Sequence, residues 1–263
     1  MSETIATPFH TCNQDGIKHS VCGHLAVPHA MFMRHGGVSP PPHASLNCGD
    51  RVGDVLDNVD ENRKRMALVL GLKEVRTVTQ VHGDRIIIID DPLQQTDQEQ
   101  ADAMLTDIAG IGLLIQQADC QAVLLHDPVR KVVAAVHSGW RGSVLNILGK
   151  TIEKMQQSFS CNPHEIQAVI SPSLGPCCAE FIHYKKELPA PLHEFHVGNN
   201  HIDFWAISRW QLESAGLQPG KITLGHHCTM CNADYFSYRR SMRNGRKETG
   251  RNGSMIALPS DER

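Results

Sequence analysis

Short apolar runs separated by polar turns recur along the chain and predict a protein rich in buried strands. Glycine, proline or acidic residues bound many of the runs, a pattern typical of strands that are covered on both faces. The clearest runs occupy residues 75–79, 86–89, 111–115, 122–125, 132–136, 168–170, 222–224 and 255–258. Residues 1–33 carry weaker patterns, from which we expect further short strands.

Between these runs, three segments carry the patterns and end signals that are typical of helices. They are a segment from Asp60 to Gly71, one with Val144, Leu148, Ile152 and Met155 on a single face, and one that Asp203 caps and that ends near Gly216. Residues 243–254 are basic and glycine-rich and predict a mobile loop. With no internal repeat and no low-complexity linker, residues 1–263 predict a single α/β domain with mixed sheets.

The stretch from Val132 to Gly142 combines an apolar strand, a tight glycine turn and the start of a helix. This order places His137 and Arg141 at the mouth of the turn, where functional side chains tend to gather. Gly139 allows close approach of a ligand, and free amides at the helix start favour an anion. Taken alone, a histidine and a tryptophan at a strand end indicate packing equally well.

Composition narrows the class of protein. The chain has 263 residues, of which 41% are hydrophobic, and a formal net charge of −3, so no overall charge favours nucleic acid or a membrane surface. The first ten residues lack the apolar core of a signal peptide, and the longest aliphatic runs are too short to span a bilayer. We therefore expect a cytoplasmic protein with no nucleic-acid or membrane partner.

The chain contains nine cysteines and sixteen histidines. In a cytoplasmic protein of this size, metal binding, catalysis or burial explains cysteines better than disulfides do. Cys228 and Cys231 form a C-x-x-C pair that His226 and His227 could complete as a second metal site, although packing is the preferred interpretation. The adjacent cysteines at 177 and 178 are interpreted as structural loop residues.

Three potential metal ligands recur in one local setting, at or near the end of an apolar strand: His82, Cys120 and His137. Strand ends of an α/β sheet converge on one crevice, so we expect the three side chains to meet. Two histidines and one cysteine form a known catalytic zinc set that leaves one position open, and zinc lowers the pKa of bound water towards about 7. Asp102 and Asp119 are candidates to orient a ligand histidine or to act as a general base.

Several basic or polar side chains are candidates to bind phosphate or another anion. They are Arg34, His35, Asn47, Arg63, Arg141, Arg239 and Arg240. Arg141 is the strongest of these candidates because it lies at a helix start. For Arg63 and Arg240, a solvated surface position is the preferred interpretation.

Six motifs occur in order from about Arg34 to the C-terminus, and together they resemble the laccase-domain family. They are Gln80–Gly83, Ala118–Cys120, Ala134–Gly142, Gly175–Cys178, Asp203–Ala206, and Tyr235–Arg240 with Thr249–Arg251. The family is also called YfiH-like, multicopper polyphenol oxidoreductase, purine nucleoside phosphorylase or peptidoglycan editing factor. The chain departs from the usual pattern at Ser138, Cys48 and Ala179, and we expect Ser138 to be tolerated and Cys48 to be buried.

The resemblance implies a four-layered fold with mixed sheets, similar to that of cytotoxic necrotizing factor, and a zinc held by His82, Cys120 and His137. It also implies phosphorolysis of adenosine, inosine and methylthioadenosine and deamination of adenosine. Other members are described as editing cell-wall precursors that carry the wrong amino acid. The laccase name implies copper, but the chain lacks the H-x-H pairs of a multicopper oxidase, so copper is disfavoured.

Two functions remain as alternatives at this point. In the first, which we prefer, the chain is a zinc-dependent purine nucleoside enzyme that uses Arg141, with Arg34 and Asn47, to bind phosphate and Asp119 in catalysis. In the second, the chain is a cysteine hydrolase with Cys120 as nucleophile and His137 as base. The two exclude each other, because a thiolate bound to a metal cannot readily attack a substrate.

Overall fold

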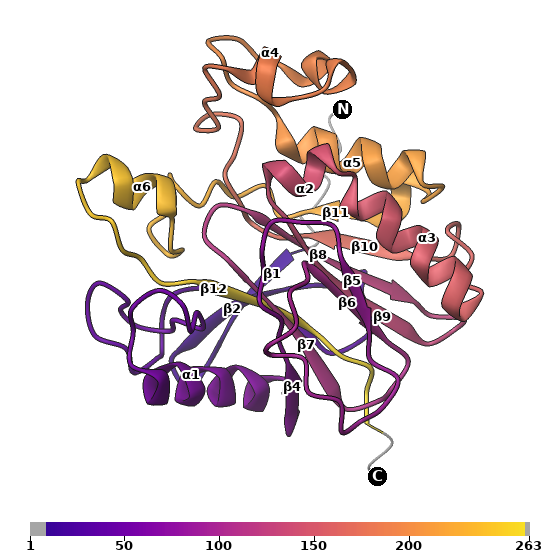
Figure 1. The fold of residues 1–263 in the computed structure, drawn as a ribbon. Helices are drawn as coiled ribbons and strands as arrows, with labels where there is room; N and C mark the ends of the chain where they lie inside the picture. The colour runs from indigo at the N-terminus through magenta and orange to yellow at the C-terminus, as the bar shows by residue number, and fades with distance from the viewer. Residues whose placement is uncertain (1–8, 261–263) are drawn as a thin grey trace, which may run out of the picture.

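The computed structural model describes residues 9–260, in which two mixed sheets pack face to face (Figure 1). In spatial order the first sheet contains β1 (Phe9–Gln14), β2 (Ile17–Cys22), β3 (His29–Phe32), β12 (Asn252–Ile256), β7 (Ile111–Gln117) and β4 (Glu74–Arg76). The second contains β11 (Ile222–Leu224), β10 (Gln167–Ile170), β8 (Gln121–Asp127), β9 (Val132–Ser138), β6 (Ala103–Thr106) and β5 (Ile86–Ile88). Neighbouring strands are antiparallel except for the parallel pairs β4–β7, β10–β11 and β5–β6.

Helices cover the outer faces of both sheets, with α1 on one side and α2, α3 and α5 on the other (Figure 1). The helical segments are α1 (Leu56–Val69), α2 (Trp140–Val144), α3 (Ile147–Phe159), α4 (Tyr184–Glu187), η1 (Ala190–Phe195), α5 (Phe204–Ser214), η2 (Pro219–Lys221) and α6 (Tyr238–Arg243). Between residues 9 and 260, no helix is both long enough and apolar enough to cross a membrane.

Alternating side chains of the central strands fill separate apolar cores. Leu113 of β7 and Leu124 of β8 point into the space between the sheets. Their neighbours point outward, where Leu114 packs with Met66 of α1 and Val123 packs in the cluster that contains α3. Because successive side chains of a strand face opposite sides, a strand in this position must be apolar throughout. The four layers thus explain the continuous apolar runs in the sequence.

The helix predicted after β9 is interrupted. Asn146 has a φ of 55°, in the left-handed region, and its side chain accepts a hydrogen bond from the amide of Gly149 at the start of α3. Such a cap contributes about 1 kcal/mol to helix stability. Val144 packs instead, like Trp140, against a separate apolar cluster that contains Leu192 and Ile207. The remaining predicted face, including Leu148, packs on β9 and its neighbours as expected.

Other segment boundaries differ from those that the sequence predicts. The first helix starts at Leu56 instead of Asp60, and the last strand starts three residues before the apolar run at 255–258 and ends two residues before its end. Strand β6 was not predicted, although it is buried throughout. The prediction that Asp203 caps a helix is confirmed, because its carboxylate accepts the amide hydrogen of Ala206 at 3.0 Å.

Candidate active site: a His–Cys–His cluster in a cavity

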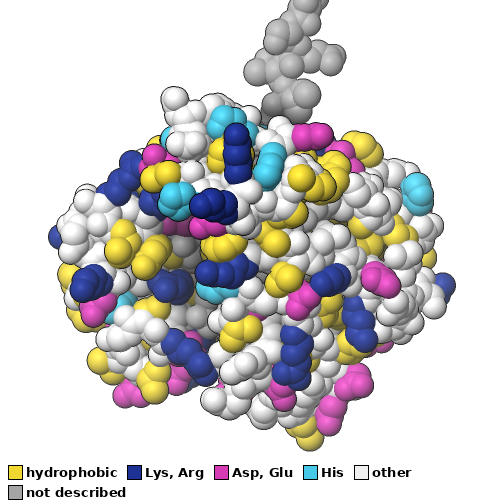
Figure 2. Space-filling view, turned by 45° about the horizontal axis from the view of Figure 1, so that its top comes forward, with side chains coloured by type: hydrophobic (Ala, Val, Ile, Leu, Met, Phe, Trp, Pro, Cys, Tyr) yellow, Lys and Arg dark blue, Asp and Glu magenta, His cyan; other side chains and the backbone are white. Residues whose placement is uncertain are grey.

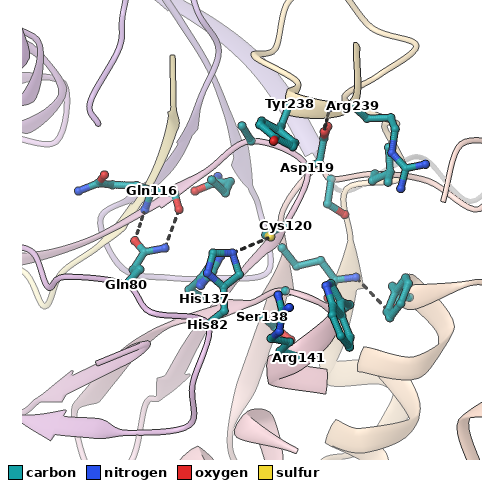
Figure 3. A pocket seen from close by; sticks show the side chains of 18 of the residues that line it. Gln80, His82, Gln116, Asp119, Cys120, His137, Ser138, Arg141, Tyr238 and Arg239 are labelled. Carbon is teal, nitrogen blue, oxygen red and sulfur yellow. Dashed lines mark hydrogen bonds between the residues drawn. The ribbon is translucent and has the colours of Figure 1, made fainter. Parts of the chain in front are cut away.

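The three predicted metal ligands meet at one end of the sheets (Figure 3). His82 comes from the loop after β4, Cys120 from the turn between β7 and β8, and His137 from β9. Their candidate ligand atoms all lie within 4.8 Å of one another. The Cys120 Sγ lies 3.9 Å from His82 Nε2, and the two imidazole rings meet edge to face at 4.8 Å. The cluster supplies two imidazoles and one thiol, which is a donor set that suits zinc.

Asp102 fixes the geometry of this cluster. Its side chain is fully buried, and Oδ1 lies 2.8 Å from Nδ1 of His137. The carboxylate also accepts hydrogen bonds from the backbone amides of Val81, His82 and Gly83, at 3.2, 3.0 and 2.7 Å. Burial raises the pKa of Asp102, but the bonds with His137 and with these amides outweigh burial and lower it. The resulting carboxylate leaves Nε2 of His137 free for a ligand, as in carboxylate–histidine–metal arrangements.

Cys120 and His137 stabilise each other's charged forms. Burial raises the pKa of Cys120, but the charge of His137 and hydrogen bonds with both histidines outweigh it and lower the pKa to about 6. Burial likewise lowers the pKa of His137, and the charges and hydrogen bonds of Cys120 and Asp102 raise it to about 9. The two histidines therefore favour the thiolate form of Cys120. A metal ligand and a nucleophile both need this form, so the charge state alone favours neither.

Because Gly139 has no side chain, it leaves room for the side chains of Cys120 and His82. A Cβ added there would lie 2.9 Å from Cys120 Sγ and 3.1 Å from His82 Cδ2. The φ of Gly139 is −81°, which suits any residue, so the need for glycine is purely steric. The backbone turn after β9 thus packs directly against two of the three ligand side chains.

We predict that Gly139→Ala weakens zinc binding by about 10–100-fold, the effect of disturbing groups that position metal ligands. The measurement is a zinc titration against a chromophoric chelator. Gly83→Ala is the matched control, because a Cβ at Gly83 would meet its nearest neighbour, Asp102 Oδ2, at an ordinary contact distance of 3.5 Å. Wild-type affinity in Gly139→Ala would contradict the packing argument.

The cluster opens into a cavity of about 770 Å³ that the ends of both sheets and several loops enclose. This volume lies within the range of about 300–1,000 Å³ that is usual for small-molecule sites. Trp140, Phe181 and Phe204 supply aromatic wall, with ring centroids 6.1 Å apart for the first two and 5.0 Å apart for the last two. Figure 2 shows a hollow on the face that comes forward, bordered by basic and hydrophobic side chains. The cavity can hold a flat organic group beside polar ligands.

Four arginines line the cavity: Arg51, Arg141, Arg239 and Arg251. Arg141 lies at the start of α2, and its exposed guanidinium stacks 4.3 Å above the ring centre of Trp140. Arg251 is half-buried, and burial lowers its pKa although Cys48, Cys120 and Asp119 act in the opposite direction. The sequence pointed to Arg251 only as part of the Thr249–Arg251 motif and gave it no role. The structure brings Arg251 and Arg141 to one cavity.

The fold does not bring Arg34 and Asn47 into the cavity, contrary to their predicted role in ligand binding. The guanidinium of Arg34 donates to the carbonyl of Ala44 at 2.8 and 2.6 Å and lies over the ring of Phe236. Asn47 is fully buried and accepts the amide hydrogen of Arg251 at 2.8 Å. Both side chains are occupied in holding loops, and Asn47 holds the backbone of Arg251, which lines the cavity.

Two further arginines are not the solvated side chains that the sequence suggested. Arg63 is 17% exposed and donates from Nε to the carbonyl of Cys48 at 2.9 Å. Arg240 donates to four backbone carbonyls, those of Thr229, Met230, Asn232 and Tyr235. Cys48 itself is fully buried, as expected, and burial raises its pKa to about 12. His35 pairs with Asp234 at 2.8 Å and does not line the cavity.

Asp119 lines the cavity, but both of its carboxylate oxygens are already bound. Oδ1 accepts the hydroxyl of Thr229 at 2.7 Å, and Oδ2 accepts the backbone amide of Arg239 at 2.6 Å (Figure 3). Its φ of 87° places it in the turn between β7 and β8. These contacts favour Asp119 as a positioning residue for the segment 229–239 and assign the orientation of a ligand histidine to Asp102.

Comparisons with known proteins agree on one family. Residues 28–259 match the model of the family described as multi-copper polyphenol oxidoreductase laccase. A purine nucleoside phosphorylase of Deinococcus radiodurans is 34% identical over 248 residues, which cover 90% of this chain and 92% of that protein. Purine nucleoside phosphorylase YfiH of Escherichia coli is 33% identical over 235 residues, covering 86% of this chain and 91% of the relative.

Solved structures with the same architecture include two from bacilli. The hypothetical protein YfiH of Bacillus licheniformis matches with a TM-score of 0.86 and 29% identity, covering 95% of this chain and 99% of that one. YlmD of Geobacillus stearothermophilus matches with a TM-score of 0.83 and 28% identity, covering 97% of this chain and all of that one. The two mixed sheets are therefore the fold of these proteins.

Proposed function

Because the chain belongs to the multi-copper polyphenol oxidoreductase laccase family, whose members include proteins named purine nucleoside phosphorylase, we propose that it phosphorolyses purine nucleosides. The observation that carries the proposal is the opening of the His82–Cys120–His137 cluster into a cavity with aromatic and arginine walls. A nucleoside needs an apolar surface for its base, and phosphate needs cationic hydrogen-bond donors. One cavity offers both.

The donor set of the cluster fits zinc. His82, Cys120 and His137 would hold the ion, and three protein ligands leave a position open for a small molecule, as catalytic zinc sites do. Bound there, zinc would supply Lewis-acid polarisation of a substrate oxygen. Asp102 would keep the ring of His137 in the tautomer that presents Nε2. Thiolate and imidazole also accept copper, but no H-x-H pair supports a copper cluster.

The cavity residues suggest how the two substrates would lie. The aromatic wall of Trp140, Phe181 and Phe204 would pack against the purine ring. Arg141 and Arg251 would bind phosphate, since guanidinium groups match phosphate oxygens in pairs. In phosphorolysis, a phosphate oxygen bonds to the anomeric carbon, the bond to the base breaks, and the base takes up the electron pair and a proton. The arginines would orient the phosphate for this attack.

The finer substrate range is part of the proposal. We propose adenosine, inosine and methylthioadenosine as substrates for phosphorolysis and adenosine for a second reaction, deamination, in which water replaces the amino group at C6. The test incubates each nucleoside with the purified chain, with and without phosphate. Free base should appear only with phosphate, and inosine should form from adenosine without it. No phosphate-dependent release of base from any of the three would overturn the proposal.

We predict that Arg141→Ala lowers kcat/KM for phosphate in phosphorolysis by about 10–100-fold. A hydrogen bond to a charged group contributes about 1.5–3 kcal/mol, and tenfold in rate corresponds to about 1.36 kcal/mol. Deamination should fall less, because it does not consume phosphate. Arg243→Ala is the control, since Arg243 is exposed and does not line the cavity. Equal losses in both reactions would show that Arg141 acts by holding Trp140 in place.

A second candidate function rests on the proximity of Cys120 to His137, whose candidate ligand atoms lie within 4.8 Å of each other. A thiolate beside an imidazolium is the pair that cysteine hydrolases use, and such an enzyme could remove an amino acid from a cell-wall precursor. In that case the metal-free protein should be active and iodoacetamide should inactivate it at Cys120. Under the zinc proposal, bound zinc should protect Cys120 from iodoacetamide. Peptide mass mapping of the labelled protein separates the two outcomes.

A further inference from the structure

A second group of potential metal ligands lies apart from the His82–Cys120–His137 cluster. The four sulfurs of this cysteine cluster all lie within 4.8 Å of one another and belong to Cys177, Cys178, Cys228 and Cys231. The Cys231 sulfur is 3.8 Å from that of Cys177 and 3.4 Å from that of Cys178. Zinc–sulfur bonds of about 2.3 Å in a tetrahedron place the sulfurs about 3.8 Å apart. The sulfurs are thus already near the spacing that a tetrahedral ion requires.

The backbone brings the two cysteine pairs together. Cys177 and Cys178 follow β10, and Cys228 and Cys231 follow β11, which is the parallel neighbour of β10. The two segments after these strands continue to pair, because Ser173 donates to the carbonyl of His227 at 3.2 Å and accepts from the amide of Thr229 at 2.9 Å. Parallel neighbours end at the same edge of a sheet, so the convergence of the cysteines is built into the topology.

The turn from Cys228 to Cys231 is held by hydrogen bonds to its carbonyls. The backbone amide of Asn232 donates to the carbonyl of Cys228 at 2.9 Å. Arg240 donates to the carbonyls of Thr229 and Met230 within the same turn, at 2.6 and 3.0 Å, and places a cation beside it. A positive charge of this kind stabilises an anionic centre.

The histidines that the sequence offered as partners do not join this cluster. His226 and His227 are both exposed, and the ring of His226 packs against Trp205 with ring centroids 5.8 Å apart. Cys177 and Cys178, which the sequence predicts as structural loop residues, lie beside Cys228 and Cys231 instead. All nine cysteines are free thiols in residues 9–260, so each of the four is available as a ligand.

We propose that Cys177, Cys178, Cys228 and Cys231 bind one zinc ion in a structural tetrathiolate site. Each thiol loses its proton on binding, so four protons are released and the ion with its four thiolates carries a charge of −2. Four protein ligands fill every position of a tetrahedral ion, which is characteristic of structural and not catalytic zinc. This site does not depend on the proposed nucleoside chemistry.

The position of the site indicates what it does. Glu180 and Phe181 follow one cysteine pair and line the cavity, and Tyr238 and Arg239 follow the other pair and line it as well. The two segments otherwise meet through a few hydrogen bonds, such as those from Arg239 to the carbonyl of Glu180 at 3.3 Å. Zinc would therefore clamp two walls of the cavity together. Its removal should raise KM for the nucleoside more than it lowers kcat.

The test measures metal in chains that lack the first site. In a His82→Ala/His137→Ala background, the full-length chain should bind about one zinc ion, and cadmium in its place should give the ultraviolet charge-transfer absorption of about four thiolates. Adding Cys228→Ser/Cys231→Ser should abolish both signals. Adding Cys12→Ser, which lies outside both clusters, should change neither. Unchanged zinc content in the Cys228→Ser/Cys231→Ser chain would overturn the proposal.

A second measurement uses the wild-type chain and does not depend on how the serine variants fold. Cys177 and Cys231 are exposed, so iodoacetamide can reach both thiols when no metal is bound. With one added equivalent of zinc per proposed site, labelling of both should slow at least about tenfold, because a metal-bound thiolate is shielded. Equal labelling with and without zinc would contradict the assignment.

Discussion

His137→Ala should remove the zinc bound at the His82–Cys120–His137 cluster and lower nucleoside phosphorolysis by about 10³-fold or more. His137 is 3% exposed and supplies one of only three ligands there, so its loss leaves an incomplete site. Lewis-acid stabilisation of a transition state is worth several kcal/mol, and each 1.36 kcal/mol corresponds to about tenfold in rate. Zinc content is measured by elemental analysis and rate by release of free base.

His82→Ala should behave in the same way, since it removes a second ligand. His164→Ala is the matched control, because this exposed histidine lies outside the cavity and its backbone carbonyl, not its ring, contacts Lys221. The readout is a fall of about one zinc ion per chain relative to this control. Full zinc occupancy in both His137→Ala and His82→Ala would rule out the cluster as the metal centre.

Cys120→His should retain zinc and a measurable fraction of the wild-type rate of phosphorolysis. In Cys120→Ala, that rate should fall by about 10³-fold. Imidazole is a competent zinc ligand, and sites with three histidines are known catalytic zinc centres. The substitution will still cost activity, because zinc–nitrogen bonds are about 0.2–0.3 Å shorter than zinc–sulfur bonds. Zinc content and phosphate-dependent release of base are measured on both variants.

The same pair of variants separates the metal from the nucleophile. An imidazole cannot form the thioester that a cysteine hydrolase requires, so that mechanism predicts equal inactivity of Cys120→His and Cys120→Ala. Activity in Cys120→His above that of Cys120→Ala supports the metal role of Cys120. A zinc-loaded Cys120→His chain with no more activity than Cys120→Ala would instead favour the nucleophile.

The sequence predicted the central layers of the fold well because their pattern has one physical cause. Strands β7, β8 and β9 are covered on both faces, and that burial requires the continuous apolar runs from which they were predicted. The break between α2 and α3 was not predictable in the same way. The periodic apolar positions continue through it, and only the left-handed backbone of Asn146 shows that the helix ends.

The sequence predicted that the three candidate metal ligands would meet, but it did not predict which residues would support them. His82, Cys120 and His137 each follow or end a strand, so convergence at one edge was a fair expectation. The sequence could not show which of Asp102 and Asp119 orients the histidine. Three backbone amides converge on Asp102, whereas two donors from the segment 229–239 occupy Asp119.

Long-range contacts also decide which polar residues reach the cavity. Arg34 and Asn47 had the right chemistry, but the carbonyl of Ala44 and the amide of Arg251 already satisfy them. Arg251 enters the cavity because it precedes β12, which lies between β3 and β7 in the first sheet. The partnership of Cys177 and Cys178 with Cys228 and Cys231 likewise follows from the pairing of β10 with β11, which no local pattern reveals.

The most direct test of the central claim follows phosphorolysis of inosine while zinc is removed and restored in the wild-type chain. The account predicts that phosphate-dependent release of base falls as a chelator strips the His82–Cys120–His137 site and returns when zinc is added back. Iodoacetamide labelling of Cys120 reports the occupancy of that site in the same samples, because zinc shields its thiolate. Undiminished phosphorolysis in protein that elemental analysis shows to be free of metal would contradict the account.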